Sequence, residues 1–418
     1  MITYKEAKKI LTKAKIKIKD ELIDSSKSIN RINVSDVYCS VNYPAGTNAA
    51  FDGFAINSKE TKNLSKKNPQ NFRILKTISA GDNPKLGKIN NFETVEVMTG
   101  ALIPKGFDTI IPIEKINFYS SSKNTKYIVI NEKIKNNQHI RYVGSDYKKR
   151  DLLIKKGTII QPSHILAFKT LGIKNIKVKK KPNILFFSTG NEISNNKNIV
   201  NWKVRNSNSH YIKSLSYNFL FNFVDGGILR DKDEKFFKRQ IYKNMKSKID
   251  IIITSGAVSA GKYDFVPLIV RMFSLSSFFK GVSIRLGKPI LFARFKNAEK
   301  AIFGLPGNPI SSSACFRFFV YPYLLNILGV KNEKPFKARL KNNFFKNKKI
   351  IRFLKVRLTA THNGKLEIQV LKGQESFRIK SFVESNTWGL FNEGQSNFKK
   401  GDLIDCYSTI GSNINIFK

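Results

Sequence analysis

The spacing of apolar residues changes along the chain, and each change marks a different kind of expected element. Near the N-terminus, Ala7, Ile10, Leu11 and Ala14 recur at the spacing of one helix face. Between residues 56 and 145 the apolar runs are short and are separated by Gly, Pro and Asn. The sequence therefore predicts strands at 72–78, 93–98, 109–113 and 127–131. Another helix is predicted at 164–171, where Gly172 ends it.

From residue 179 to 330 the pattern alternates between strand and helix. Strands are expected at 183–187, 222–229, 251–253, 290–294 and 301–304. Helices are expected at 210–221, 234–245 and 311–328, the last of them broken or kinked near Pro322. This alternation predicts an α/β layer domain with a mostly parallel sheet. Beyond residue 331, short alternating segments at 353–360, 366–371, 403–408 and 413–417 predict a small β-barrel or β-sandwich, of which we favour the barrel.

The chain is too long for one hydrophobic core, since single cores stop growing beyond about 250–300 residues. The patterns together predict a multidomain α/β protein. The expected domains are a helical or linker domain (1–43 and 146–178), a β-rich inserted domain (44–145), a central α/β domain (179–330) and a C-terminal β-barrel (331–418).

The formal net charge is +44, which alone would suggest a polyanionic partner. The excess is mostly Lys spread along the whole chain, and Asn and Ile are frequent as well. All three have AT-rich codons, so codon bias accounts for the charge, and no basic–aromatic reader motif indicates nucleic acid. The apolar stretch 318–330 is too short to cross a bilayer. The Cys residues lie far apart, so we expect a cytoplasmic protein without a membrane or nucleic-acid partner.

Two strand ends run into loops of small and hydroxyl residues. Such residues let backbone N–H groups approach a bound anion, and ligands of open α/β sheets sit at the carboxyl ends of strands. The alternative is an ordinary connection between a strand and a helix. On the first interpretation the candidate substrate-binding residues are Ser188, Thr189, Gly190, Thr254, Ser255, Gly256, Ser259 and Gly261.

Four acidic residues fall at loop positions: Asp52, Glu192, Asp231 and Asp264. The last three follow strands of the same expected sheet and should gather on one rim. Clustered carboxylates repel one another, and Mg²⁺ held by one or two carboxylates plus substrate phosphates is the usual reason for such a cluster. The alternative is that each acid is a helix cap or a solvated side chain.

A cationic half of the site is predicted beside these acids. Arg285 and Lys288 flank a Gly, and the turn 304–311 runs into a helix, where Pro306, Gly307, Asn308 and Ser311 could hold an oxyanion. The alternative is a Pro/Gly turn beside the general surplus of Lys. Acids for a metal and cations for an oxyanion together favour chemistry on a phosphorylated or oxyanion substrate.

The order of these motifs resembles the MoeA family of molybdopterin molybdenumtransferases, to which the second half of gephyrin-type proteins is related. The resemblance covers essentially the full length. It rests on NAAFDGFA (48–55), EVMTGALIPKGFDTIIPIE (96–114), RYVGSD (141–146), FFSTGNEI (186–193), NSNSHY (206–211), TSGAVSAGKYD (254–264), IRLGKP (284–289) and GLPGNP (304–309).

The resemblance implies an enzyme that transfers molybdate onto adenylylated molybdopterin and releases AMP with the help of Mg²⁺. It also implies a homodimer, and the molybdopterin adenylyltransferase and molybdoenzyme maturation proteins as partners. By motif match the catalytic positions are Asp52, Thr99, Asp146, Glu192, Asp231 and Asp264, with Glu192, Asp231 and Asp264 as metal ligands. Arg285, Lys288 and Ser311 match anion-holding positions.

The sequence also departs from the pattern of the family it resembles at six positions. This chain has Asn191 in place of Asp, Ala257 in place of Gly, Lys262 in place of an acid, Arg285 in place of Lys, Leu286 in place of Pro and Lys355 in place of Arg. Ala257 is expected to disfavour positive φ. These departures leave two alternatives open. One is nucleotide chemistry of the molybdopterin adenylyltransferase type, and the other is a non-catalytic gephyrin-like scaffold or degraded paralogue.

Overall fold

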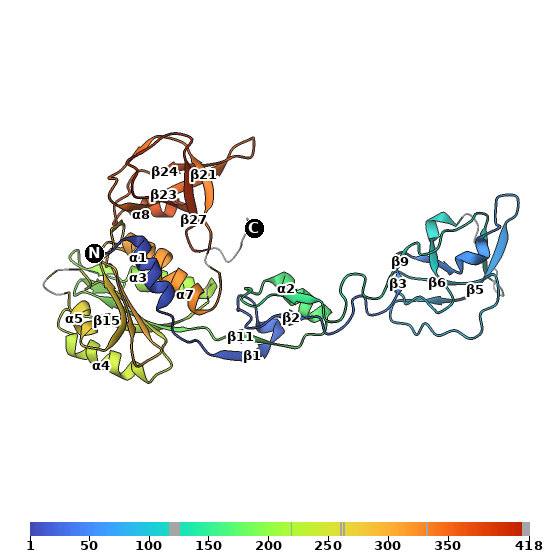
Figure 1. Cartoon of the computed structure of the whole chain (residues 1–418), viewed down its shortest axis with the longest axis horizontal. Coiled ribbons are helices and arrows are strands. Elements are labelled where there is room, and N and C mark those ends of the chain that lie inside the picture. The colour runs from blue at the N-terminus through green and yellow to red at the C-terminus, as the bar shows by residue number, and fades with distance from the viewer. Residues whose placement is uncertain (117–125, 219, 260, 262–263, 332, 412–418) are drawn as a thin grey trace. The chain divides into compact units, whose positions relative to one another are not determined.

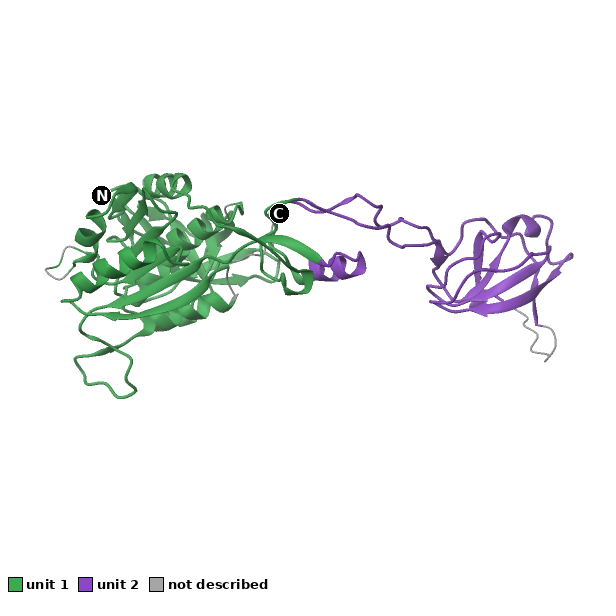
Figure 2. Cartoon of the chain, turned by 90° about the horizontal axis from the view of Figure 1, so that it is seen from below, with its two compact units in different colours: residues 1–35, 156–162, 175–418 green, residues 36–155, 163–174 purple. Residues whose placement is uncertain are grey.

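The computed structural model describes residues 1–116, 126–218, 220–259, 261, 264–331 and 333–411 (Figure 1). The chain divides into two compact units, coloured separately in Figure 2. Unit 1 comprises residues 1–35, 156–162 and 175–418, and unit 2 comprises residues 36–155 and 163–174. Within the described ranges, no helix is both long and apolar enough to cross a membrane.

Unit 2 is built on a five-stranded sheet with the order β7-β4-β6-β5-β8. The short pairs β3–β9 and β10–β2 and the helix α2 complete it. The elements are β2 (Val37–Tyr38), β3 (Asn48–Ala49), β4 (Gly53–Ile56), η2 (Ser58–Thr61), β5 (Gln70–Ile78), β6 (Glu93–Val97), β7 (Thr109–Pro112), η3 (Ile113–Lys115), β8 (Tyr127–Ile130), β9 (Ile140–Arg141), β10 (Leu152–Ile154) and α2 (Pro162–Thr170).

The centre of unit 1 is a six-stranded sheet with the order β15-β12-β16-β20-β19-β17. The first four strands are parallel, and β19 and β17 continue the sheet in antiparallel pairings. The strands are β12 (Asn183–Thr189), β15 (Asn222–Leu229), β16 (Ile251–Ser255), β17 (Leu275–Lys280), β19 (Leu291–Phe295) and β20 (Ala301–Leu305). Because the parallel strands share one direction, their carboxyl ends open at one edge, where ligands of such sheets bind.

The two faces of this sheet bury alternate residues against different helices. Phe186 and Ile253 belong to a core with α1, α3, α6 and α7, whereas Phe187 and Ile252 belong to a core with α4 and α5. The helices are α1 (Tyr4–Lys13), α3 (Ser207–Asn218), α4 (Glu234–Met245), α5 (Val266–Arg271), α6 (Pro309–Cys315) and α7 (Tyr321–Ile327). The domain is therefore a three-layer α/β fold, as the strand–helix alternation predicts.

A π-helical segment, η4 (Phe316–Val320), joins α6 to α7 and carries a buried cation. Arg317 is only 3% exposed, and its guanidinium donates to both carboxylate oxygens of Glu333 at 2.8 and 2.7 Å. Its Nε donates to the carbonyl of Ser408 at 2.8 Å. The bidentate pair with Glu333 neutralises the buried guanidinium, and the bond to Ser408 ties the helix to the end of the C-terminal domain.

The C-terminal domain of unit 1 is a closed five-stranded barrel. Its strands follow the order β23-β24-β21-β27-β25, and β25 pairs back onto β23. The two-residue strand β18 of the α/β domain also pairs with β23, in parallel. The elements are β18 (Ile284–Arg285), β21 (Phe336–Leu340), β22 (Phe344–Phe345), β23 (Ile351–Ala360), β24 (Leu366–Val370), α8 (Ile379–Glu384), β25 (Thr387–Phe391), β26 (Asn397–Phe398) and β27 (Leu403–Ser408).

Smaller elements of unit 1 complete the chain: β1 (Asp20–Asp24) with β11 (Asn175–Lys179), β13 (Ile193–Ser194) with β14 (Val204–Arg205), and η1 (Ser25–Lys27). The α/β layer and the barrel confirm the predicted fold class. The prediction of a barrel strand at 413–417 lies outside the described residues. The helix α1 packs into the α/β core, where Tyr323 donates its hydroxyl to the carbonyl of Ala14 at 2.9 Å.

Candidate functional site

A cavity of about 1110 Å³ lies at the carboxyl ends of β12, β16 and β20. Most of the predicted substrate-binding residues of the strand-end loops line it, and so do the three predicted metal ligands. The lining residues from those predictions are Ser188, Thr189, Gly190, Glu192, Asp231, Ser255, Gly256, Ser259, Asp264, Pro306, Gly307 and Asn308. We call this space the strand-end cavity.

The polar wall of the strand-end cavity is cross-linked by residues at the start of α3. Asn208 donates from Nδ2 to Ser255 Oγ at 2.6 Å and to the Gly307 carbonyl at 2.7 Å. The Ser188 hydroxyl donates to Asn206 Oδ1 at 2.5 Å. The two Asn residues come from the NSNSHY motif, which the sequence flagged without assigning them a role. Their hydrogen bonds link the carboxyl ends of β12, β16 and β20 to one another.

Two of the predicted substrate-binding residues do not line the cavity. β16 runs to Ser255, so Thr254 belongs to the buried strand rather than to the loop, and it is fully buried. Gly261 lies outside the lining, where its N–H donates to Asp264 Oδ2 at 2.7 Å. The interpretation of Thr254 as the start of the loop is therefore wrong, because the sheet continues for two residues past Ile253.

The loop after β16 makes a sharp left-handed turn. Gly256 has φ +105°, and a Cβ atom there would lie 2.3 Å from Thr189 Oγ1. Ala257 follows with φ 53°, so the expectation that this residue disfavours positive φ is overridden by the turn. A left-handed non-glycine residue costs about 1–2 kcal/mol. The strained residue Ala257 lines the strand-end cavity, as does Gly256.

Two of the three acids on the rim accept hydrogen bonds from nearby amides. Asp264 accepts from Gly261, and Asp231 accepts from Asn191 Nδ2 at 2.8 Å while its own N–H donates to Asn191 Oδ1. An Asp at 191 would instead place a second carboxylate against Asp231. Among the described residues no three His, Cys, Asp or Glu side chains come close enough to hold a metal ion by themselves. The donor set still fits Mg²⁺ bound mainly by substrate phosphates, which needs only one or two carboxylates.

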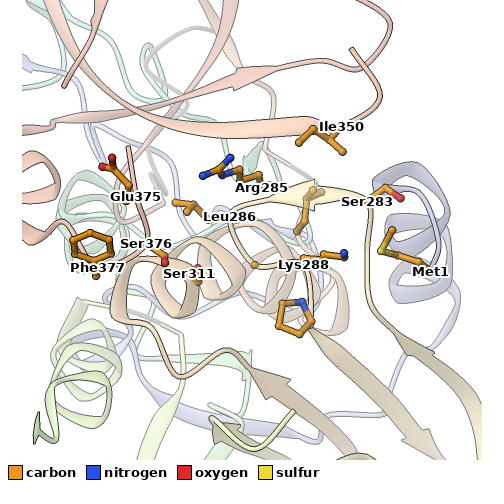
Figure 3. A pocket seen from close by; sticks show the side chains of 13 residues that line it. Met1, Ser283, Arg285, Leu286, Lys288, Ser311, Ile350, Glu375, Ser376 and Phe377 are labelled. Carbon is orange, nitrogen blue, oxygen red and sulfur yellow. The ribbon is translucent and has the colours of Figure 1, made fainter. Parts of the chain in front are cut away.

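A second cavity, the anion pocket, has a volume of about 540 Å³ and contains the predicted cationic half of the site. Arg285, Lys288 and Ser311 all line it, as Figure 3 shows. Glu375 is the carboxylate in its described lining, and it also pairs with Arg378 at 3.7 Å. The pocket therefore carries excess positive charge, which suits a small anion.

Local packing explains how the segment Arg285–Lys288 is shaped. Gly287 has φ +97°, and a Cβ atom there would lie 2.3 Å from Cys315 Sγ. A glycine between the two cations therefore lets the turn pack against α6, which carries Ser311. Burial raises the pKa of the Cys315 thiol, so it stays an uncharged packing group.

A further arginine lies next to the anion pocket. Arg352 pairs in register with Arg285 across β18 and β23. Burial and the nearby Arg285 charge lower the pKa of the Arg352 guanidinium, and within the described chain its buried Nε has no hydrogen-bond partner. The sequence gives no signal for this residue, because the pairing joins positions in different domains.

The two cavities adjoin each other. Pro289 and Phe377 line both, and Phe377 is 62% exposed. Ser376 lines the anion pocket and bonds to the wall of the strand-end cavity: its Oγ accepts from Asn308 Nδ2 at 3.0 Å. An anion in the first cavity and a larger ligand in the second would therefore be neighbours. Phe377 and Ser376 were not predicted as site residues, since nothing around them is motif-like.

The remaining predicted catalytic residues lie in unit 2. Thr99 donates to Asp52 Oδ1 from both its N–H (2.6 Å) and its hydroxyl (2.7 Å). These bonds lower the pKa of Asp52 below its usual value. Asp146 lies elsewhere in the unit, in a hollow of about 570 Å³ that Arg141 also lines. The structure thus pairs Asp52 with Thr99 and does not bring Asp146 into their hydrogen-bonded pair.

Comparison with known proteins first defines the class. Residues 186–326 match the family model described as a probable molybdopterin binding domain. Residues 2–172 match the model for the MoeA N-terminal region (domain I and II), and residues 337–408 match the MoeA C-terminal region (domain IV). The chain belongs to the MoeA family.

Individual relatives agree over nearly the whole chain. The molybdopterin molybdenumtransferase of Staphylococcus aureus (strain N315) is 30% identical over 389 residues, which cover 92% of this chain and 90% of the relative. The one from Haemophilus influenzae is 28% identical over 97% of this chain and 98% of its own. The crystal structure of the molybdopterin biosynthesis moeA protein from Pyrococcus horikoshii OT3 has a TM-score of 0.79 at 25% identity. It covers 97% of this chain and 99% of that chain.

Proposed function

We propose that this chain is a molybdenum insertase of molybdenum cofactor biosynthesis, a transferase that moves molybdate onto adenylylated molybdopterin and releases AMP. The observation that carries the proposal is the adjacency of two cavities with different chemistry. The anion pocket is cationic, and the strand-end cavity combines hydroxyls, backbone groups and carboxylates; the two share Pro289 and Phe377.

The anion pocket suits molybdate, which is a compact dianion. Arg285 and Lys288 would neutralise its charge, and the Ser311 hydroxyl would donate to one of its oxygens. Ser311 is only 6% exposed and is held in the first turn of α6, so its position is set before the anion arrives. Such preorganised charge needs no rearrangement at the moment of reaction.

The strand-end cavity is large enough for a pterin nucleotide, since small-molecule sites commonly measure about 300–1,000 Å³. The loop 255–259 would contact the pyrophosphate, and Phe377 would pack against a planar ring. Mg²⁺ would be held mainly by that pyrophosphate, with one or two carboxylates from among the rim acids Glu192, Asp231 and Asp264, and it would supply charge neutralisation. The rim acids, through Mg²⁺, and the cationic pocket would thus each neutralise one anion of the substrate pair.

The transfer balances without a redox partner. Two sulfur–molybdenum bonds form at the dithiolene, and the two thiol protons leave with one molybdate oxygen as water. One water molecule opens the phosphoanhydride, and AMP departs. The chain's contribution is orientation and charge neutralisation, which together supply several kcal/mol of barrier lowering.

Release of AMP from adenylylated molybdopterin tests the proposal. We expect release to depend on both molybdate and Mg²⁺. Arg285→Ala should raise the molybdate concentration for half-maximal rate by about tenfold or more, because it removes a charge-assisted hydrogen bond. Lys296→Ala removes an exposed lysine that lines neither cavity and is the matched control. AMP release that never exceeds background in the unmodified protein would overturn the proposal.

Two further assays, ATP turnover and genetic complementation, separate the alternatives. Turnover of ATP with free molybdopterin would indicate nucleotide chemistry of the adenylyltransferase type. A protein that rescues no insertase-deficient strain would indicate a scaffold or a degraded paralogue. The Asp52–Thr99 pair argues against a lone adenylyltransferase-like domain, since it belongs to unit 2 and not to the α/β layer.

We further propose that the active form is a cytoplasmic homodimer. Each unit exposes a large apolar side chain that a partner subunit could cover: Leu22 on β1 of unit 1 is 68% exposed, and Leu166 on α2 of unit 2 is 71% exposed. The adenylyltransferase that makes the substrate and proteins that mature molybdoenzymes are the proposed protein partners. Sedimentation equilibrium that returns a monomer mass at micromolar concentration would contradict the dimer.

A further inference from the structure

A buried lysine of the barrel holds the loop that forms one wall of the anion pocket. Lys355 lies on β23 and is 0% exposed. Its ammonium donates to the carbonyls of Gly373 (2.7 Å), Glu375 (3.2 Å) and Arg378 (3.1 Å). We call residues 373–378 the pocket loop. Within the described residues no carboxylate forms an ion pair with Lys355, so the loop carbonyls are its solvation.

The main chain of Lys355 holds the same loop. Gln374 accepts from the Lys355 N–H at 3.0 Å and donates to the Lys355 carbonyl at 2.8 Å. The Ser381 hydroxyl adds a bond to the Gly373 carbonyl at 2.6 Å. The start of the pocket loop is therefore fixed to β23 at both the side chain and the backbone, while its tip reaches toward the cavities.

The tip of the pocket loop carries the residues that meet ligand. Glu375, Ser376 and Phe377 line the anion pocket, and Phe377 also lines the strand-end cavity. The Ser376 carbonyl accepts from the Ile310 N–H at 3.3 Å, one residue before Ser311. The pocket loop therefore connects Lys355 both to the wall that its own tip forms and to the α6 wall that carries Ser311.

We propose that the Lys355 ammonium is a positioning group that sets the affinity of the anion pocket for molybdate. This inference rests on the proposed function. An ammonium has three N–H donors and no lone pair, which matches three carbonyls. A neutral amine has one donor fewer and turns a lone pair toward a carbonyl oxygen, so loss of the proton would release part of the loop. A protonated Lys355 also adds positive potential beneath the pocket.

The proton on Lys355 is lost at an accessible pH. Burial lowers its pKa from 10.5 to about 8, and the nearby Glu375 carboxylate opposes that shift. We therefore expect molybdate affinity to fall as pH rises through about 8. Between about 8 and 10.5 the unfolded chain binds more protons at this group than the folded one, so its contribution to folding stability increases with pH. Affinity and this stability contribution move in opposite directions, which distinguishes loosening of the loop from unfolding.

The experiment compares Lys355→Met, which keeps length without charge, with Lys355→Arg, which keeps the charge at every pH tested. Calorimetric titration with sodium molybdate at about pH 7 and about pH 9 gives the affinity, and hydrogen exchange of a peptide covering 371–380 reports the loop. Lys300→Met is the control. Lys300 is a partly buried lysine that donates to the carbonyls of Ser247 (2.8 Å) and Ile249 at the opposite edge of the sheet.

We expect Lys355→Met to weaken molybdate binding about tenfold at pH 7, to speed exchange in the loop and to lose the pH dependence. Lys355→Arg should bind within about threefold of the unmodified protein, with a flat profile from pH 7 to about 9. Unchanged affinity in Lys355→Met, or an equal loss in Lys300→Met, would overturn the proposal. If Lys355→Met does not fold, a pH dependence in Lys355→Arg equal to that of the unmodified protein would overturn it too.

The proposal and the proposed function can fail separately. If the unmodified protein binds no molybdate while Lys355→Met still speeds exchange in the loop, the proposed function fails and the positioning of the loop stands. If the unmodified protein binds molybdate and the loop exchanges equally in all variants, the positioning role fails alone.

Discussion

Gly256 offers the sharpest test of how the strand-end cavity is shaped. It follows β16 directly with φ +105°, and its N–H donates to the Leu305 carbonyl at 2.8 Å. In Gly256→Ala the new Cβ would lie 2.3 Å from Thr189 Oγ1 and 2.7 Å from the Thr189 carbonyl oxygen. Neither the backbone oxygen nor the buried Thr189 can move far, so the turn itself must shift.

The expected cost has two parts. A left-handed alanine costs about 1–2 kcal/mol, and the forced contact adds about 1–3 kcal/mol as in overpacked cores. Gly227→Ala is the matched control, because Gly227 has φ +83° but nothing lies within 4 Å of the place its new methyl group would take, so it bears the first part alone. The difference of about 2 kcal/mol corresponds to about 4–8 °C in the melting temperature of a domain of this size.

Activity should separate the two variants further. A displacement of about 1 Å at a substrate-positioning loop costs about 100-fold in rate. We therefore expect Gly256→Ala to release AMP about 100-fold more slowly and Gly227→Ala to stay within about threefold of the unmodified protein. Differential scanning calorimetry gives the melting temperatures, and the AMP-release assay gives the rates. Equal melting temperatures and equal rates for the two variants would refute the role assigned to the turn.

Three further predictions concern hydrogen bonds at charged groups. Thr99→Val should raise the Asp52 pKa toward its ordinary value, whereas Thr99→Ser should keep that pKa low, and NMR titration of the carboxyl carbon measures both. The stability that the lowered pKa contributes should be lost as pH falls through that pKa. Asn191→Asp should destabilise the protein by about 1–2 kcal/mol without Mg²⁺, since it sets a second carboxylate against Asp231, and added Mg²⁺ should restore the melting temperature. Arg317→Met should cost about 3–5 kcal/mol in urea unfolding, because it removes the bidentate partner of the largely buried Glu333 carboxylate; a loss below about 1 kcal/mol would contradict this.

The sequence predicts elements well where one local period dominates. β15 at 222–229 and α4 at 234–245 match their expected bounds, and in α4 the apolar residues Phe237 and Ile241 lie on one buried face. The helix predicted at 311–328, with a break or kink near Pro322, is divided into α6, η4 and α7, and α7 begins at Tyr321, next to that proline. Local propensity does not reveal the π-helical form of η4, whose Arg317 pairs with Glu333 sixteen positions onward.

Site residues within local motifs could also be predicted, whereas site residues brought in by tertiary packing could not. Residues in motifs, such as Arg285 and Ser311, lie in the predicted pocket, while Lys262 lies outside the described residues. Arg352 and Phe377 lie where the barrel meets the α/β layer, and Lys355 bonds to the pocket loop about twenty positions further along the chain. Their importance depends on tertiary packing, so no local spacing could have shown it. Ala257 shows the converse, since a turn imposed by its neighbours overrides a residue's own preference.

The two-residue pairing of β18 with β23 has a consequence for building hybrid enzymes. The barrel has its own closed core, so a barrel taken from a relative should fold on this chain. The anion pocket, however, is divided along that seam, with Arg285 on one side and the pocket loop on the other. A hybrid should recover molybdate binding only when the donor barrel brings a loop that fits the recipient's Asn308 turn. The residues on both sides of the β18–β23 pairing must therefore match one another, even though the barrel and the α/β domain each have their own core.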